Sequence, residues 1–150
     1  MSQRFDVHQL SPDGYRAMLE LSGYVKKSGL ELDLLELTKI RASQINGCAF
    51  CVAMHVEEAR KLGVAEVRMH MLSVWREAVC YSDRERAALA WTEALTRLSD
   101  GEISDAVYAE VCQQFTAKEI SDLTYAAALI NGWNRLMIAS RTPLQVGVAK

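Results

Sequence analysis

Apolar residues recur at helical spacing through most of the chain, and no segment shows the sustained alternation of a β-strand. Glycine, proline and asparagine separate these segments, as they do between helices. The predicted helices cover about residues 12–27, 33–45, 48–62, 65–79, 82–98, 104–115 and 116–140. We therefore expect an all-α fold of six to seven helices that forms a single domain over residues 1–150.

Several helix ends carry recognisable capping sequences. Ser82–Glu85 and Thr116–Glu119 both match the capping box, in which a hydroxyl residue and a glutamate three positions later satisfy free backbone amides. Ser104 is a plausible cap of a shorter helix, and Ser11-Pro12 resembles a cap followed by a proline in the first turn. Asn46-Gly47 is expected to end the second helix and to form a turn before the third.

Composition excludes several classes of function. The chain has 150 residues and a net charge of −2 with both signs interspersed, so nucleic acid is not an expected partner. The N-terminal residues lack the apolar core of a signal peptide, and no apolar run is long enough to cross a membrane. A cytoplasmic, reducing location is the resulting expectation. The four cysteines are then interpreted as thiols, ligands or catalysts.

Two of the cysteines share one helix with a histidine. With 100° per residue, Cys48, Cys51 and His55 fall within an arc of about 60° on the apolar face. Glu57 and Lys61 lie on the opposite face. Cysteine and histidine are often buried in the core of a protein, and core packing would explain any one of these three residues. It explains less well why all three lie on the same face. Zinc binding is a second interpretation, although no second pair of ligands follows the first.

A redox interpretation uses every feature of this motif. Cys48 would open the helix, where free amides and the helix dipole stabilise a thiolate. Cys51 lies one turn later, at a Cα separation of about 5–6 Å that permits a disulfide. His55 is four residues beyond Cys51 and can take the proton of a neighbouring thiol. The residues alone leave open which cysteine attacks, because the dipole favours Cys48 and the histidine favours Cys51.

The preceding helix offers a carboxylate to orient that histidine. Glu36 lies in a leucine-rich segment, but Asp33 three positions earlier makes a capping box an equally good explanation. Ser43 lies on the same helix face as Glu36 and is a candidate for a shared polar track. Lys39 and Arg41 are expected to contact solvent.

The residues match a known family. Glu36, eleven further residues and the pattern Cys48-x-x-Cys51-x-x-x-His55 resemble the alkylhydroperoxidase D-like proteins of the carboxymuconolactone decarboxylase superfamily. The late sequence Asn131–Arg135 is similar to the same family. The resemblance implies an all-helical fold that assembles as trimers or hexamers. Superfamily decarboxylases work without the cysteine pair, so this pair argues against decarboxylation.

The resemblance also implies roles for the four site residues. Cys51 would attack a hydroperoxide, Cys48 would resolve the product to a disulfide, and His55 would deprotonate Cys51. Glu36 would complete the relay through a water. A dithiol would reduce the disulfide, and in the best-studied branch it comes from a lipoylated partner protein. No cofactor and no metal ion are expected. Two alternatives are a zinc-stabilised binding protein and a disulfide reductase or redox sensor without peroxidase activity.

A few other residues carry expectations. The best-studied branch has a histidine immediately before the second cysteine, where this chain has Phe50, so the motif does not specify the reductant. Phe50 and Met54 fall on the outer face of their helix, which favours a homo-oligomer. Cys80 and Cys112 are expected to be inert core thiols, and His70 a packing or surface residue.

Overall fold

The computed structural model describes residues 2–144, and these residues contain helices but no strands. The all-α prediction is therefore confirmed. The α-helices are α1 (Val7–Leu10), α2 (Pro12–Lys26), α3 (Leu32–Asn46), α4 (Ala49–Lys61), α5 (Glu66–His70), α6 (Asp83–Thr96), α7 (Asp105–Gln114) and α8 (Ala117–Ser140). Two short 3-10 helices cover Met71–Val74 and Leu98–Asp100.

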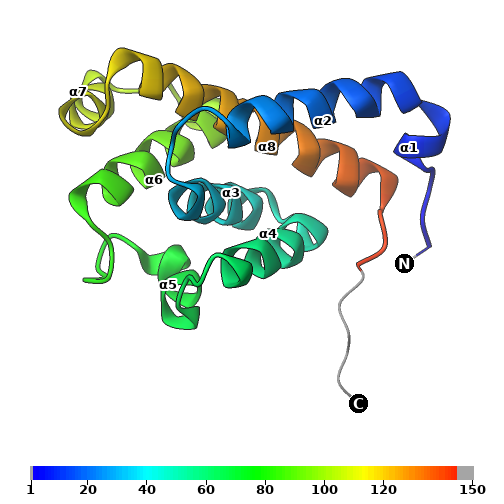
Figure 1. Ribbon diagram of the computed structural model, residues 1–150, viewed down its shortest axis with the longest axis horizontal. Coiled ribbons are helices and arrows are strands. Elements are labelled where there is room, and N and C mark those ends of the chain that lie inside the picture. Colours follow the sequence, from blue (N-terminus) through cyan, green and yellow to red (C-terminus); the bar gives the residue numbers. More distant parts are fainter. Residues whose placement is uncertain (1, 145–150) are drawn as a thin grey trace.

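The helix α3 lies at the centre of the fold. It packs against α4, α6 and α8, while α2 packs mainly on α8 (Figure 1). In Figure 1, α2 and α4 run from right to left, and α3 and α8 run in the opposite direction. Successive helices along α2, α3 and α4 therefore reverse direction, so that the ends of α2 and α4 lie on the same side. This arrangement places the start of α4 beside the end of α8.

The predicted helix starts are confirmed in detail. Both capping boxes form, with Ser82 and Glu85 at α6 and Thr116 and Glu119 at α8. The Ser104 hydroxyl caps α7 by accepting from the backbone of Val107. Local sequence fixes these ends because each cap satisfies amides that have no partner within the helix.

The predicted helix over residues 65–79 is wrong in its second half. The α-helix ends at His70, a 3-10 helix follows to Val74, and the chain then turns. The guanidinium of Arg86 donates to the carbonyls of Trp75, Arg76 and Ala78, which gives these carbonyls partners outside a helix. Long-range hydrogen bonds thus replace the local ones. The short α1 was not predicted, so residues 2–144 contain eight α-helices instead of the expected six to seven.

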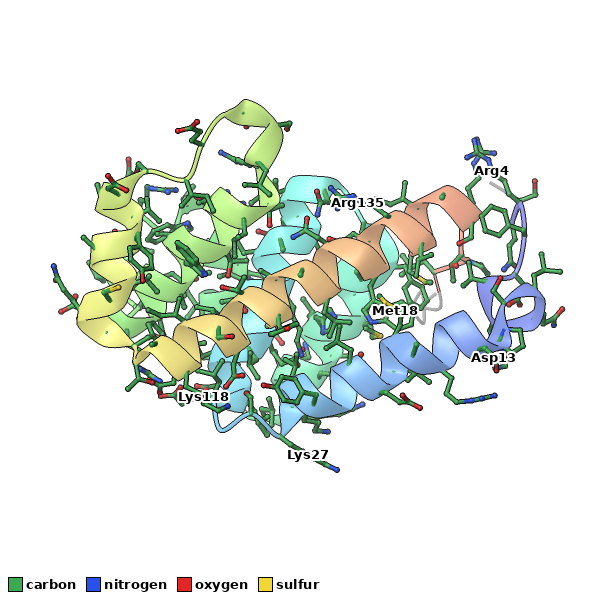
Figure 2. All side chains as sticks on the ribbon, turned by 90° about the horizontal axis from the view of Figure 1, so that it is seen from above. Arg4, Asp13, Met18, Lys27, Lys118 and Arg135 are labelled. Carbon is green, nitrogen blue, oxygen red and sulfur yellow. A yellow bond between two sulfur atoms is a disulfide. The ribbon has the colours of Figure 1, made fainter. Side chains whose placement is uncertain are left out.

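The recurring sequence Ile-Asn-Gly brings two asparagines together. The side-chain amide of Asn46, at the end of α3, donates to the side-chain carbonyl of Asn131 in the middle of α8 at 2.9 Å. Next to Asn131, Gly132 lies where α2 approaches α8 closely. A Cβ atom at Gly132 would lie 3.1 Å from Cε of Met18, which points from α2 toward α8 (Figure 2).

The two cysteines outside the motif are not buried. Cys80 is partly exposed and Cys112 is exposed, so the prediction that they are core thiols is wrong. Cys112 lies on α7, where helical spacing does not turn it toward the core. His70 is a surface residue, as expected.

Between residues 2 and 144, no helix has the length and apolar character needed to span a membrane.

Candidate functional site

The turn between α3 and α4 sets the position of the first cysteine. Gly47 ends α3 with a φ of 71°, in the left-handed region that favours glycine. The backbone amide of Cys48 then donates to the carbonyl of Ser43 at 2.9 Å. Cys48 becomes the N-cap of α4, and its sulfur accepts from the backbone amide of Cys51. The prediction that Cys48 opens the helix is confirmed.

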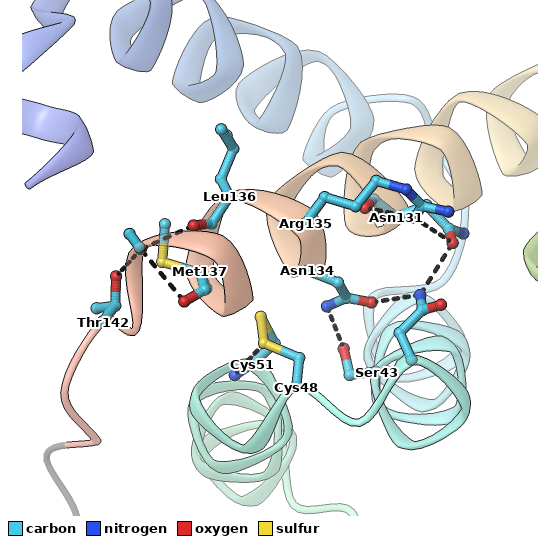
Figure 3. The surroundings of a disulfide bond; sticks show 11 residues. Ser43, Cys48, Cys51, Asn131, Asn134, Arg135, Leu136, Met137 and Thr142 are labelled. Carbon is cyan, nitrogen blue, oxygen red and sulfur yellow. Dashed lines mark hydrogen bonds between the residues drawn. A yellow bond between two sulfur atoms is a disulfide. The ribbon is translucent and has the colours of Figure 1, made fainter. Parts of the chain in front are cut away.

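Cys48 and Cys51 form a disulfide at the start of α4. Their Cα atoms are 5.4 Å apart, within the separation expected from one helical turn. Both residues are buried, and they pack against Ile130 and Met137 of α8. Figure 3 shows the disulfide between the first turn of α4 and the last turns of α8. Two cysteines brought together in this way can cycle between dithiol and disulfide without a change of fold.

Glu36 and His55 meet in the interior between α3 and α4. Nδ1 of His55 lies 2.6 Å from Oε2 of Glu36, and both residues are buried. The contact is direct, so the water that the family resemblance placed in this relay is not needed between these two groups. The capping-box alternative for Glu36 is wrong, because the N-cap of α3 is Glu31, without a side-chain cap, and the Glu36 carboxylate contacts His55.

Lys39 holds the other oxygen of the same carboxylate. Its Nζ lies 2.8 Å from Oε1 of Glu36, and its side chain is only 15% exposed. The expectation of a solvent contact is therefore wrong for Lys39. Burial raises the pKa of Glu36, but the hydrogen bond from His55 and the charge of Lys39 outweigh it, so that the pKa is lowered overall. Glu36 is thus an anion at neutral pH.

An ionised Glu36 fixes the tautomer of the histidine. Because the carboxylate can only accept, Nδ1 of His55 carries the hydrogen and donates it. Nε2 then carries a lone pair that can accept a proton. His55 lies one turn beyond Cys51 on α4, where side chains four residues apart are neighbours. The geometry therefore gives the His55 ring an orientation that is set by Glu36.

A cavity of about 380 Å³ opens beside this group. Glu36, Cys51 and His55 line it, whereas Cys48 does not. Most of its wall is apolar, from Leu19, Leu32, Leu35, Phe50, Met54, Leu62, Leu129, Ile130, Trp133 and Met137. Cys48 instead borders a second, larger hollow along the outer side of α4. The two residues of one disulfide thus border different openings.

Comparison with known proteins identifies the family. The sequence model of the carboxymuconolactone decarboxylase family matches residues 12–94, more than half of the chain. This match includes Glu36, Cys48, Cys51 and His55. The chain belongs to the carboxymuconolactone decarboxylase family. Helix α8, which closes one side of the cavity, lies beyond the matched residues.

Relatives cover nearly the whole chain. The uncharacterized protein YdfG of Bacillus subtilis is 39% identical over 93% of this chain and 95% of its own. A crystal structure from Agrobacterium tumefaciens, of a protein of unknown function with a suggested role as the antioxidant defence protein AhpD, superposes with a TM-score of 0.94. It is 39% identical and covers 97% of this chain and 99% of its own. The fold is therefore AhpD-like.

A more distant structure has the same fold. The debrominase Bmp8 is 18% identical, with a TM-score of 0.82 over 92% of this chain and 74% of its own. At this identity the likeness concerns the arrangement of helices alone. An AhpD-like family fold thus occurs in a protein that is named for dehalogenation, and the chemistry has to be argued from the residues of the site.

Sequence reasoning missed how α8 anchors the first cysteine. The side-chain amide of Asn134 donates to the hydroxyl of Ser43 at 3.0 Å, and both residues are fully buried. Ser43 therefore bonds to α8 and does not join a polar track with Glu36. Asn46 donates to the side-chain carbonyl of Asn134 at 2.8 Å (Figure 3). The sequence signals for this network were the family-like run around Asn134 and the recurrence of Ile-Asn-Gly at Asn46 and Asn131.

Arg41 also departs from expectation. Its Nε lies 2.6 Å from Oε1 of the buried Glu93, so it is an interior ion-pair partner and not a solvent contact.

The part of the chain that the structure describes holds no cluster of three histidine, cysteine or acidic side chains arranged to bind a metal ion.

Proposed function

We propose that this protein is a thiol-dependent peroxidase that reduces organic hydroperoxides through the Cys48–Cys51 pair. The observation that carries the proposal is the shared cavity of Cys51 and His55, with Glu36 bonded to the far nitrogen of the ring. Cys51 lines this cavity, whereas Cys48 does not. This asymmetry favours Cys51 as the attacking thiol, which the helix-end argument left open.

The proposed cycle begins with reduced cysteines. His55 accepts the proton of Cys51 at Nε2, and the charge of Glu36 stabilises the resulting imidazolium. The thiolate attacks the terminal oxygen of the hydroperoxide, the O–O bond breaks, and an alcohol leaves with the proton from His55. The sulfur of Cys51 is then a sulfenic acid.

Resolution and reduction complete the cycle. The thiol of Cys48 attacks the sulfur of the sulfenic acid, which forms the disulfide and releases water. An external dithiol then attacks the disulfide, leaves as its own oxidised form and returns both cysteines to thiols. A lipoylated protein remains one candidate reductant.

The test counts thiols in reduced protein before and after one equivalent of cumene hydroperoxide. We expect two thiols to disappear, one cumyl alcohol to form, and peptide mapping to find a Cys48–Cys51 disulfide. Free Cys80 and Cys112 serve as internal controls, because neither lines the cavity. If Cys48 and Cys51 stay reduced while peroxide persists, the proposal is wrong.

Two alternatives make different predictions in the same assay. A disulfide reductase or redox sensor would exchange with protein disulfides without consuming peroxide. A zinc-stabilised binding protein would contain about one zinc per chain when it is purified without chelators. Elemental analysis beside the thiol count separates these from a peroxidase.

Assembly into trimers or hexamers is part of the same proposal. Met54 is 43% exposed on α4, which supports the idea that another copy covers this face. Light scattering at several concentrations measures the subunit number. A monomer at all concentrations would contradict the proposed assembly and leave the peroxidase proposal untouched.

A further inference from the structure

The cavity beside Cys51 is apolar along most of its wall but carries three lysines, Lys26, Lys39 and Lys61. Two of them have a counter-ion. Lys39 pairs with Glu36, and Nζ of Lys61 lies 2.7 Å from Oε1 of Glu58. Among residues 2–144, no ion pair involves Lys26. Lys26 is thus an exposed lysine that lines the cavity and has no ion-pair partner in the described part of the chain.

This charge lies at the end of the cavity remote from the sulfur. Helices α2 and α4 run in the same direction (Figure 1), so Lys26 and Lys61, near their C-terminal ends, are on one side. Cys51 is in the first turn of α4. At 1.5 Å per residue, Lys61 is about 15 Å from Cys51 along the helix axis. Along α2, the same rise separates Tyr15 from Lys26 by about 16 Å.

The wall between the two ends is suited to an alkyl chain. Tyr15 packs edge-on against Trp133 at the sulfur end, and Trp133 donates to the hydroxyl of Ser22. Leu19, Leu35 and Leu129 continue the lining toward the lysines. A ligand that uses the full cavity needs a long apolar body and an anionic group at one end.

We propose that the cavity binds hydroperoxides of long-chain carboxylic acids. The carboxylate contacts Lys26, with Lys61 nearby, the alkyl chain lies between α2 and α4, and the hydroperoxide group reaches Cys51. The proposal rests on the peroxidase function argued above and names its substrate class. The reaction transfers one oxygen atom to the sulfur of Cys51 and leaves the corresponding hydroxy acid, whose carboxylate is unchanged.

The first experiment compares three oxidants by the rate of Cys51 oxidation in reduced protein. These are linoleic acid hydroperoxide, its methyl ester and tert-butyl hydroperoxide. The free acid is expected to react about fivefold or more faster than the ester, since only the acid can pair with an ammonium group. It should also react faster than tert-butyl hydroperoxide, which cannot span the cavity. Equal rates for acid and ester would overturn the proposal.

Variants then locate the charge. Lys26→Gln is expected to slow the oxidation of Cys51 by the free acid about fivefold. It should leave the rates with the methyl ester and with tert-butyl hydroperoxide unchanged. Lys27→Gln is the matched control, because Lys27 is also exposed but does not line the cavity and points away from the body of the protein (Figure 2). A similar loss in both variants would show a general charge effect and contradict the assigned contact.

A binding measurement does not depend on turnover. Titration calorimetry of laurate into the oxidised protein should give a dissociation constant that Lys26→Gln raises about fivefold and Lys27→Gln leaves unchanged. No laurate binding to the wild type would overturn the inference. Failure of all three oxidants, with laurate still binding, would instead reject the peroxidase function and retain an acid-binding cavity.

Discussion

Two buried glutamates lie on neighbouring helices of this fold, and they have different partners. Glu36 on α3 bonds to His55 and Lys39 and lines a cavity. Glu93 on α6 accepts from Arg41 at 2.6 Å, from Arg76 at 2.6 Å and from the indole of Trp75 at 3.0 Å. Burial raises the pKa of Glu93, and these three donors lower it further than burial raises it.

The difference lies in what each partner can do. Arginine keeps its proton at any pH that proteins experience, so the Glu93 group can only hold α6, α3 and the turn after Val74 together. Histidine exchanges a proton near neutral pH, so the Glu36 group can pass one to or from a ligand in the cavity. Burial and a lowered pKa are common to both groups. Partner type and access to a cavity separate the catalytic candidate from the structural one.

Removing the charge of Glu93 should have the largest effect on stability. Glu93→Gln leaves Arg41 and Arg76 without a carboxylate at a site that is 3% exposed, and the expected loss is about 3–5 kcal/mol of unfolding free energy. Glu36→Gln should cost only about 1–2 kcal/mol, because Lys39 can move toward solvent. Urea unfolding under reducing conditions measures both variants. Equal losses would remove the distinction between the two groups.

The same pair of variants should reverse its order in the chemistry. Glu36→Gln is expected to slow oxidation of the Cys48–Cys51 pair by hydroperoxide about 100-fold, since His55 loses the group that sets its tautomer. Glu93→Gln should leave this rate nearly unchanged at a temperature where the variant is folded. Stopped-flow mixing with cumene hydroperoxide gives both rate constants. Slow oxidation in Glu93→Gln together with fast oxidation in Glu36→Gln would reverse the catalytic and structural assignments of the two glutamates.

Acid should remove the stabilising effect of Glu93. Its pKa is lowered from 4.5, so its contribution is complete above that value and disappears as the pH falls through the lower pKa of the folded state. The difference in melting temperature between wild type and Glu93→Gln should therefore be constant from neutral pH to about pH 5 and shrink below about pH 4. A difference that grows on acidification would contradict the lowered pKa.

The smallest expected effect belongs to Lys39. Its charge helps to lower the pKa of Glu36, so Lys39→Met should raise this pKa. The acid limb of the peroxide reaction should then move to higher pH by less than about one unit. A pH profile of the oxidation rate measures the shift, with Lys27→Met as the control. An unchanged profile would show that Lys39 does not act on this carboxylate, and a shift to lower pH would contradict the direction of its effect.

Much of the fold follows from local sequence. The capping boxes at Ser82 and Thr116 and the turn at Gly47 are confirmed, because each is a short-range event whose partners lie within a few residues. The segment after His70 could not be predicted in the same way. Its carbonyls bond to Arg86, and a contact between distant positions leaves no periodic signal.

The site, like the fold, has features that local sequence predicts and features that depend on packing between helices. Spacing within one helix placed Cys48 and Cys51 at disulfide distance, and the family resemblance linked Glu36 to His55. The direct contact of these two groups, the ion pair of Lys39 and the wall supplied by α8 come from packing between helices. Patterns within a single sequence carry little of this, which is why they predict solvent contacts for Lys39 and Arg41, whose side chains are largely buried.

The central claim is that Cys51 is the thiol that attacks peroxide, and trapping of the sulfenic acid tests it most directly. Cys48→Ser cannot form the disulfide, so one equivalent of cumene hydroperoxide followed by dimedone should label Cys51, as detected by mass spectrometry. Cys51→Ser, treated identically, should show no label at Cys48. Labelling of Cys48 in Cys51→Ser, with none at Cys51 in Cys48→Ser, would contradict the account.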